Sequence, residues 1–306
     1  MTVRRVALLT VVVALVAVLA TACGGNDEKT VQSTSRDTTA TTATNGTATT
    51  GRTGGSGGTT PTGTVAPNAA GVPLNVAFVR SEKMGTAHRR VAPTQAVGAA
   101  AVEQLLAGPT ADERTAGLTS AVPAGTRLLG LDIANGTATV DLSKEFVSGG
   151  GSLSMRERLG QVVFTLTQFP SVKNVSFRVA GTPTTVFGGE GVMIGSTVDR
   201  SDFEDVSPAI FLESVAPGDA VSSPVKVAGT ANTFEATVRI RVVGADGRVL
   251  ADTFTTATSG SGTRGTFQTT VAFDKGSNTS AKVVVFEDSP KDGSMVNVVE
   301  VPVRFA

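Results

Sequence analysis

The sequence predicts an α+β protein in which a split β-α-β-β-α-β domain precedes a seven-stranded β-sandwich. Residues 73–180 alternate strand-like runs with segments whose apolar side chains recur at a helical period. Residues 208–306 instead hold seven short runs, alternating or rich in β-branched residues, with Pro, Gly, Asp and Asn between them. A length of 306 residues also suits two domains rather than one.

The N-terminal segment, residues 1–22, has the pattern of an export signal. Arg4 and Arg5 precede the apolar run Val6–Leu19, which is short for a membrane span and suits the core of a signal peptide. Small residues then lead into Cys23, as in a bacterial lipoprotein signal, and Cys23 is the one cysteine of the chain. We therefore expect lipidation of Cys23; an ordinary signal peptide or anchor with an incidental cysteine is the alternative.

Residues 23–72 are predicted to be the lipidated Cys23 followed by a disordered tether rich in Thr and Gly. The tether has almost no aliphatic side chains, so it cannot bury enough apolar surface to offset the entropy cost of ordering. The acyl chains of a lipoprotein, palmitate among them, satisfy the two-signal requirement for stable anchoring. We expect the protein to be lipid-anchored on the extracytoplasmic face of the cell membrane, with the bilayer as one partner.

The first domain, residues 73–190, is predicted to begin with a strand at Pro73–Arg80. Thr94 is a suitable N-cap for a helix whose apolar residues share one face. Gly108–Pro109 marks the end of that helix, because glycine adopts the left-handed conformation that ends helices and proline cannot continue one. Thr110–Glu113 then fits a capping box for a second, short helix.

The rest of this domain is predicted to be a hairpin, a helix and a strand. Asn135–Gly136 is a hairpin turn signal between "RLLGLDI" and "TATVDL". Ser154–Glu157 fits a capping box for a helix that ends before Pro170. "NVSFRVA" closes the domain as a strand. The predicted order is β-α-(α)-β-β-α-β, with helices packed on an antiparallel-rich sheet.

Residues 191–207 are weakly patterned and are predicted to be a linker. The second domain, residues 208–306, follows with seven strand-like runs: "AIFLESV", "PVKVAGT", "ATVRIRVV", "RVLADTFT", "GTFQTTVAF", "AKVVVFE" and "VNVVEVPVRF". The turn Gly244–Gly247 indicates a hairpin between two of them. Seven strands in a domain of this size indicate a β-sandwich, and the missing Trp and Cys exclude only the antibody variety.

Two stretches of the chain resemble known families. "VEQLLAGPTADERTAGLTSAVPAGTRLLGLDIANGTATVDLSKEF" with "VVFTLTQFPSVKNVSFRVAG" resembles the GerMN domain, the N-terminal domain of spore-germination protein M. "PAIFLESVAPGDAVSSPVKVAGTANTFEATVRIRVVGADGRVLADTFTTATSGSGTRGTFQTTVAF" resembles the immunoglobulin-like domain of bacterial spore germination, so that a seven-stranded Ig-like β-sandwich is expected. The order of the two resembles that of actinobacterial GerMN lipoproteins.

The resemblance implies function only coarsely. It implies a small α/β domain outside the cytoplasm, similar to the ring-building motifs of sporulation assemblies, with no known catalysis and with self-association as one form of partnership. Lipoproteins that combine GerMN with a propeller modulate a sensor kinase, but this chain lacks the propeller. Sporulation does not follow from the domain names, because a fold does not fix a function.

Composition excludes several classes of function. Positive and negative residues balance at 26 each, so no net charge indicates a nucleic-acid partner. Trp and Tyr are absent, which disfavours binding by stacking on bases or sugar rings. With one His and one Cys, neither a zinc site built from these residues nor an intramolecular disulfide is possible. We expect no cofactor and no bound metal.

The region around the single histidine holds the candidate contact residues. His88 in "TAHRRVAP" is expected to be a surface residue in a loosely structured segment between strand and helix. A catalytic triad that uses it as base is the alternative, and it would need a serine and an orienting acid nearby in space. The adjacent Arg89 and Arg90 are candidate contacts for an anionic polymer or a partner.

Other motifs are weaker. Ser223–Lys226 has the S-x-x-K spacing of penicillin-binding enzymes, but it begins a strand and no K-T-G follows. Asp141 and Glu145 could be cast as the carboxylate pair of a glycosidase, although sugar-binding aromatic residues are missing. The acidic loop 287–293 could bind calcium, yet no D-x-D-x-D-G pattern is present. Solvated charges are the expected state of that loop.

The sequence therefore predicts a membrane-anchored, extracytoplasmic, non-enzymatic interaction or scaffold module of the cell envelope. Its partners are expected to be envelope proteins or a cell-wall polymer, contacted through unpaired strand edges. A module that binds cell-wall glycan is the first alternative. A cell-wall hydrolase and an accessory of a sensor kinase or transporter are the others.

Overall fold

The computed structural model describes residues 71–306, all of which belong to one structural unit. The predicted signal peptide, Cys23 and the tether as far as residue 70 lie outside the described residues. No helix in the described part is long and apolar enough to cross a membrane. The predicted fold class is confirmed: the structure is mixed α+β, with a first domain of helices and strands and a β-sandwich after it.

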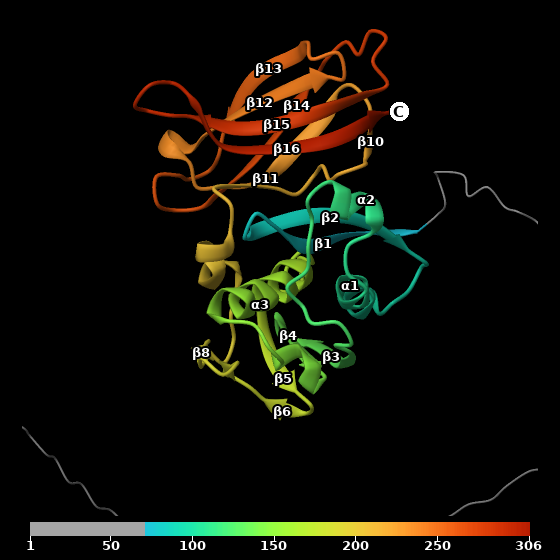
Figure 1. The fold of residues 1–306 in the computed structure, drawn as a ribbon, viewed down its shortest axis with the longest axis vertical. Coiled ribbons are helices and arrows are strands. Elements are labelled where there is room, and N and C mark those ends of the chain that lie inside the picture. Colours follow the sequence, from blue (N-terminus) through green and yellow to red (C-terminus); the bar gives the residue numbers. More distant parts are fainter. Residues whose placement is uncertain (1–70) are drawn as a thin grey trace, which may run out of the picture. The chain divides into compact units, whose positions relative to one another are not determined.

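The first domain consists of three layers (Figure 1). Its elements are β1 (Val72–Arg80), β2 (Lys83–Val91), α1 (Val97–Leu106), α2 (Ala111–Thr115), β3 (Leu128–Ala134), β4 (Thr137–Leu142), the 3-10 helix η1 (Lys144–Val147), α3 (Ser152–Leu166), β5 (Asn174–Val179) and β6 (Thr182–Pro183). One layer is the four-stranded sheet in the order β3-β4-β5-β6, in which β4 and β5 run parallel. Helices α1 and α3 lie between this sheet and the β1–β2 hairpin.

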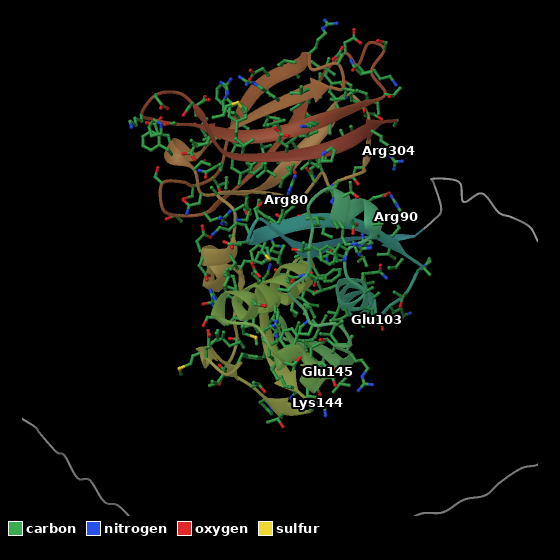
Figure 2. The ribbon with its side chains drawn as sticks, in the orientation of Figure 1. Arg80, Arg90, Glu103, Lys144, Glu145 and Arg304 are labelled. Atoms are coloured by element: carbon green, nitrogen blue, oxygen red, sulfur yellow. The ribbon has the colours of Figure 1, made fainter. Side chains whose placement is uncertain are left out.

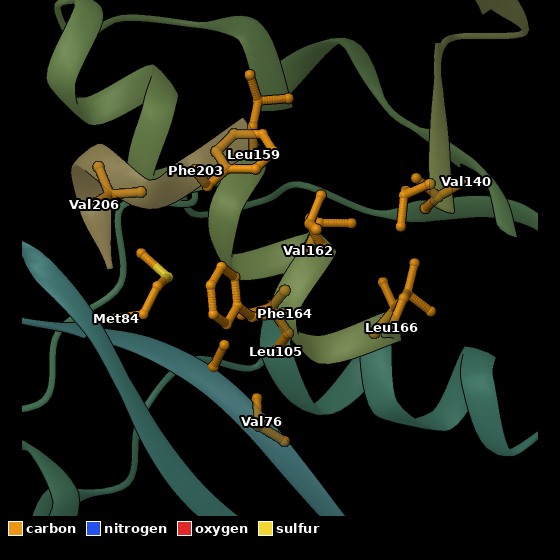
Figure 3. Packing of buried hydrophobic residues seen from close by; sticks show 14 of the residues in the cluster. Val76, Met84, Leu105, Val140, Leu159, Val162, Phe164, Leu166, Phe203 and Val206 are labelled. Atoms are coloured by element: carbon orange, nitrogen blue, oxygen red, sulfur yellow. The ribbon is translucent and has the colours of Figure 1, made fainter. Parts of the chain in front are cut away.

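Helix α3 is the centre of this domain, because it is covered on both sides. Leu159, Val162 and Leu166 are fully buried in its apolar core, part of which Figure 3 shows. Two polar residues of the helix, Gln161 and Thr165, are fully buried as well, and both form hydrogen bonds with the main chain of β1. Thr165 accepts a hydrogen bond from the Ala77 N–H at 3.0 Å, and Gln161 donates one to the Ala77 carbonyl at 3.2 Å. Buried polar groups are tolerated when they are hydrogen-bonded in this way.

Strand β2 corrects one sequence expectation. The segment around His88 is not loosely structured: Lys83–Val91 pairs in register with β1 over its whole length. The hairpin turn consists of Ser81 and Glu82, whose φ angles are +49° and +62°. Such turns are normally signalled by Asn or Gly, so no turn signal in the sequence indicates this one.

The helix starts are partly as predicted. The capping box of α2 is confirmed: the Thr110 hydroxyl accepts from the Glu113 N–H, and the Glu113 carboxylate accepts from the Thr110 N–H. The box predicted at Ser154–Glu157 is wrong, because α3 already begins at Ser152. Its first turn is capped instead by Glu190, whose carboxylate accepts from the Ser152 N–H at 2.7 Å and from the Ser152 hydroxyl.

The segment predicted as a linker, residues 191–207, is packed against the first domain. A short hairpin of β7 (Val186–Phe187) and β8 (Val192–Met193) is followed by the 3-10 helix η2 (Arg200–Val206). Phe203 and Val206 of η2 are fully buried in the first core, in the same region as Met84 (Figure 3). This segment is therefore an ordered part of the first domain's packing.

The second domain is a sandwich of two sheets. Its strands are β9 (Ile210–Leu212), β10 (Ala220–Val221), β11 (Val225–Ala231), β12 (Thr237–Gly244), β13 (Val249–Thr256), β14 (Gly265–Val271), β15 (Ser280–Asp288) and β16 (Met295–Phe305), with the 3-10 helix η3 (Phe234–Ala236). The sheets have the orders β10-β16-β15-β12-β13 and β14-β11-β9. All seven predicted runs form strands, and the two-residue β10 is an addition. The predicted hairpin at Gly244–Gly247 is confirmed between β12 and β13.

Candidate interaction site at the junction of the two domains

Strand β9 joins the two domains by contributing to both cores. Ile210 and Leu212 point into the sandwich, whereas Phe211 packs into the core of the first domain. The alternation of a strand explains this, because successive side chains point to opposite faces. The Phe211 ring meets that of Phe164 edge-to-face, with the centroids 5.1 Å apart. The Arg200 guanidinium lies over both rings, at 4.9 Å from the Phe164 centroid and 5.9 Å from that of Phe211.

Glu213, directly after β9, binds three side chains of the first domain. Its carbonyl oxygen accepts from His88 Nε2 at 2.9 Å and from the Asn75 amide at 3.3 Å. Its carboxylate forms an ion pair with Arg200 at 2.8 Å. These polar contacts surround the apolar contact of Phe211, so the junction is fixed by shape and by hydrogen bonds together.

His88 faces an acceptor on each side of its ring. Nδ1 lies 2.7 Å from the Asp219 carboxylate, which also accepts from the Ala216 N–H, and Nε2 lies 2.9 Å from the Glu213 carbonyl. Only the imidazolium carries two N–H donors, so only the protonated ring satisfies both acceptors. Burial lowers the pKa of His88, but the hydrogen bond and charge of Asp219, with the Glu213 carbonyl, outweigh it and raise the pKa above its ordinary value.

The expectation that His88 is a surface residue is therefore wrong. Its side chain is 27% exposed, and it belongs to the junction. No serine takes part in the hydrogen bonds of its ring, which are made to Asp219 and Glu213. The arrangement has the acid and the histidine of a triad but places a main-chain carbonyl where a nucleophile would have to be.

The two arginines beside His88 are separated by the alternation of the strand. Arg89 is largely buried and forms an ion pair with Glu113, and it also donates to the Gly108 carbonyl at 3.2 Å. Arg90 is exposed and donates to the Gly71 carbonyl at 3.2 Å. They therefore do not form one continuous basic patch. That Arg89 and Arg90 contact a polymer or partner stays a prediction.

The carboxylates considered for sugar chemistry bind local groups. Asp141 accepts from the Gly181 N–H at 3.0 Å. A hydrogen bond from Ser143 is the main reason why the pKa of Glu145 is lowered, so this residue is not a raised-pKa acid of the kind that a glycosidase requires. Figure 2 shows Lys144 and Glu145 well away from Arg80 at the junction.

The remaining candidates are also held by local contacts. The Ser223 hydroxyl accepts from the Phe273 N–H at 2.9 Å, and Lys226 is an exposed residue of β11. Glu287 is buried and accepts from the Phe234 N–H and from the Asn297 amide, while Asp292 accepts from Ser294. Within residues 71–306, no group of three or more His, Cys, Asp and Glu side chains is placed to hold a metal ion.

A groove of about 410 Å³ runs along the junction. Leu118 and three segments line it: the β1–β2 turn with the start of β2, strand β9 with the residues on either side of it, and the first half of β16. The volume is within the range of small-ligand sites in proteins. Sequence reasoning did not find this groove or the residues Asn75, Arg200, Glu213 and Asp219, because they are far apart in the chain and match no motif.

Comparison with known proteins agrees with this architecture. A family model described as "Sporulation and spore germination" (Germane) matches residues 61–185. A second, described as "Immunoglobulin-like domain of bacterial spore germination" (Gmad2), matches residues 209–294. No curated protein matches the chain.

Two solved structures of GerM from Bacillus subtilis are similar to the chain. The first GerMN domain is 24% identical with a TM-score of 0.38, and the match covers 43% of this chain and 99% of that one. The tandem GerMN domains are 16% identical with a TM-score of 0.39, and the match covers 66% of this chain and 62% of that one. By the two family models, the chain has a region that matches Germane, followed by a region that matches the Gmad2 immunoglobulin-like domain of bacterial spore germination.

Proposed function

We propose that this protein is a non-enzymatic interaction module of the cell envelope, anchored by acylated Cys23 at the extracytoplasmic face of the membrane. One observation carries the proposal: ionisable side chains from distant parts of the chain meet at the domain junction, where they hold Phe211 and β9 in place. These side chains bind each other and the main chain, and they do not point together into the groove as catalytic groups would. The two domains are therefore held in one arrangement, and residues of both form a single surface at the junction.

The same contacts argue against a hydrolase. A general base needs a free nitrogen or oxygen within reach of the proton that it removes. Both nitrogens of His88 are engaged by acceptors, and Asp141 and Glu145 are held separately by local donors. The descriptions of the two matching family models name sporulation and spore germination. We propose envelope assembly or a germination-like process as the process in which this chain acts.

Crosslinking in living cells followed by mass spectrometry tests this function. We expect envelope proteins to be captured by the wild type and to be lost with Cys23→Ala at equal protein levels, because the anchor determines which partners are within reach. Lys144→Gln serves as the control, because it alters an exposed side chain far from the junction and leaves Cys23 unchanged.

The outcomes separate the possible functions. Capture of proteins by the anchored form supports the proposal. Capture of peptidoglycan alone would favour the glycan-binding module, and hydrolysis of purified cell wall by the wild type would replace the proposal with an enzyme.

A further inference from the structure

Strand β16 has an edge that its own sheet leaves open. It pairs with β15 along most of its length, but its other neighbour, β10, pairs with it only at Arg304 and Phe305. The first half of β16 forms one wall of the junction groove instead. An unpaired strand edge presents N–H and C=O groups that a further strand can bind.

The direction of the main-chain groups follows from the hydrogen bonds at the end of the strand. The Pro302 carbonyl accepts from the Gly218 N–H, and the Arg304 N–H donates to the Asp219 carbonyl. Phe305 instead donates toward the β15 side, to Thr279. Because these groups alternate along a strand, the N–H and C=O of Glu300 also point to the open edge.

The alternation extends as far as Val299, which pairs with Val285 before the register of the two strands shifts. The N–H of Val299 therefore points toward β15, and the carbonyl of Val298, in the same trans peptide, points the opposite way. The Val298 carbonyl and the Glu300 N–H thus both face the groove. No hydrogen bond from residues 71–306 reaches either of them there.

One side chain already binds this edge. Arg80, at the end of β1, donates to the Glu300 carbonyl at 2.7 Å, and Figure 2 shows it between the hairpin and the sandwich. The Arg80 guanidinium thus donates to the Glu300 carbonyl, where the N–H of a neighbouring strand would otherwise donate. The neighbouring Val298 carbonyl has no such substitute among the residues that the structure describes.

The lining of the groove is largely apolar and also contains two cations, Arg80 and Lys83, and one acid, Glu300. The apolar residues include Met84, Leu118, Ile210, Val215, Val299 and Val301. Each of the two cations donates to a main-chain carbonyl: Arg80 to that of Glu300, and Lys83 to that of Asp205 at 2.6 Å. In the described structure neither cation has a carboxylate within ion-pair distance, whereas Glu300 is paired with Lys282 at 2.7 Å.

We propose that the junction groove binds an extended, acidic peptide segment of a partner protein, which adds as a strand to the open edge of β16. The Val298 carbonyl and the Glu300 N–H begin the ladder, the apolar lining residues take alternate side chains, and Arg80 and Lys83 pair with an acidic residue. This inference rests on the proposed function and specifies the surface and the chemistry of its partner.

The test is selection from a displayed library of short random peptides on the purified unit of residues 64–306. We expect enrichment of peptides with alternating β-branched residues and an acidic residue. Binding of the enriched peptide should slow hydrogen exchange at the amide of Glu300. A copy N-methylated at alternate amides should bind about tenfold more weakly or worse, because it cannot complete a ladder.

Matched charge variants test whether a cation that lines the groove contributes to binding. Lys83→Gln should lower the affinity for the enriched peptide about two- to fivefold, the range expected for one exposed ion pair. Lys144→Gln, at an exposed lysine outside the groove, should leave its affinity unchanged. No enrichment, protection at other amides only, or equal binding of the N-methylated copy would overturn the inference. If cellular crosslinking still captured proteins through another surface, the inference would fail while the proposed function stood.

Discussion

Several side chains of this protein are fixed in position by partners that are distant in the sequence. Glu113 shows which of its contacts a local sequence pattern predicts and which it does not. Its role in the capping box with Thr110 was predictable from spacing, but its ion pair with Arg89 was not, because that pair depends on strand β2. His88 shows the same limit: the sequence presents a lone histidine, and only the fold brings Asp219 and the Glu213 carbonyl to its two nitrogens.

The two acceptors of His88 predict a pH-dependent stability. The pKa of His88 is raised in the folded protein above about 6.5, the value for an unfolded chain. The folded state thus binds the proton more tightly, so the stabilisation is complete below about pH 6.5 and is lost as the pH rises through the folded-state pKa. We compare the unfolding free energy of the wild type with that of His88→Gln. The advantage of the wild type should be about 1 kcal/mol larger at about pH 5.5 than at about pH 8.5.

Urea unfolding of residues 64–306 at the two pH values measures this difference. Asp219→Asn serves as the matched variant, because it removes the charge that favours the imidazolium and should flatten the same pH dependence. The ring forms an ion pair with Asp219, and its other contact, Glu213, has a carboxylate that is paired with Arg200. An advantage of the wild type that grows toward alkaline pH would show that His88 is held as the neutral ring.

At the scale of elements, the sequence was informative where periodicity and turn chemistry agreed. The seven strands of the second domain followed from β-branched runs between turn residues, and the Asn135–Gly136 hairpin from its turn signal. Strand β2 was missed because its turn, Ser81–Glu82, adopts left-handed angles without glycine. The cap of α3 was misplaced because Glu190 comes from 38 residues away, beyond the reach of any local pattern.

Strand β9 depends on one glycine of its neighbour. A Cβ atom at Gly229 of β11 would lie 2.0 Å from the Phe211 carbonyl oxygen, so Gly229→Ala must push the two strands apart. Because overpacking against backbone costs on the order of 2 kcal/mol or more, we expect a clear loss of unfolding free energy and faster hydrogen exchange in β9. Lys226→Ala, at an exposed position of the same strand, is the control and should have little effect. Wild-type stability of Gly229→Ala would contradict the close approach.

On the scale of the whole described molecule, the segment between the domains enters the first core, and this was not predictable. The sequence indicated two domains and a weakly patterned segment between them. The structure instead buries Phe203 and Val206 of that segment and Phe211 of β9 in the first core. Local periodicity cannot show which of two cores an apolar residue enters, so the junction and its groove could not be inferred from sequence.

The packing of Phe211 predicts coupled unfolding. We expect the wild-type unit of residues 64–306 to unfold in one cooperative transition, and Phe211→Ala to separate this into two while costing about 3–5 kcal/mol in stability. Phe267→Ala removes an equally buried ring from the second core alone. It should destabilise the sandwich without abolishing the Phe164–Phe211 contact. Two transitions already present in the wild type by calorimetry would show that the domains unfold independently.

The most direct test of the proposed function is site-specific photo-crosslinking in living cells. A photoactivatable residue replaces Val298, which is 43% exposed and lines the groove, and in a parallel strain it replaces the exposed Lys144. A non-enzymatic interaction module that binds its partner at the junction groove predicts a discrete protein adduct at position 298 and none at position 144. Absence of any protein adduct at both positions, together with turnover of cell-wall material by the purified protein, would contradict it.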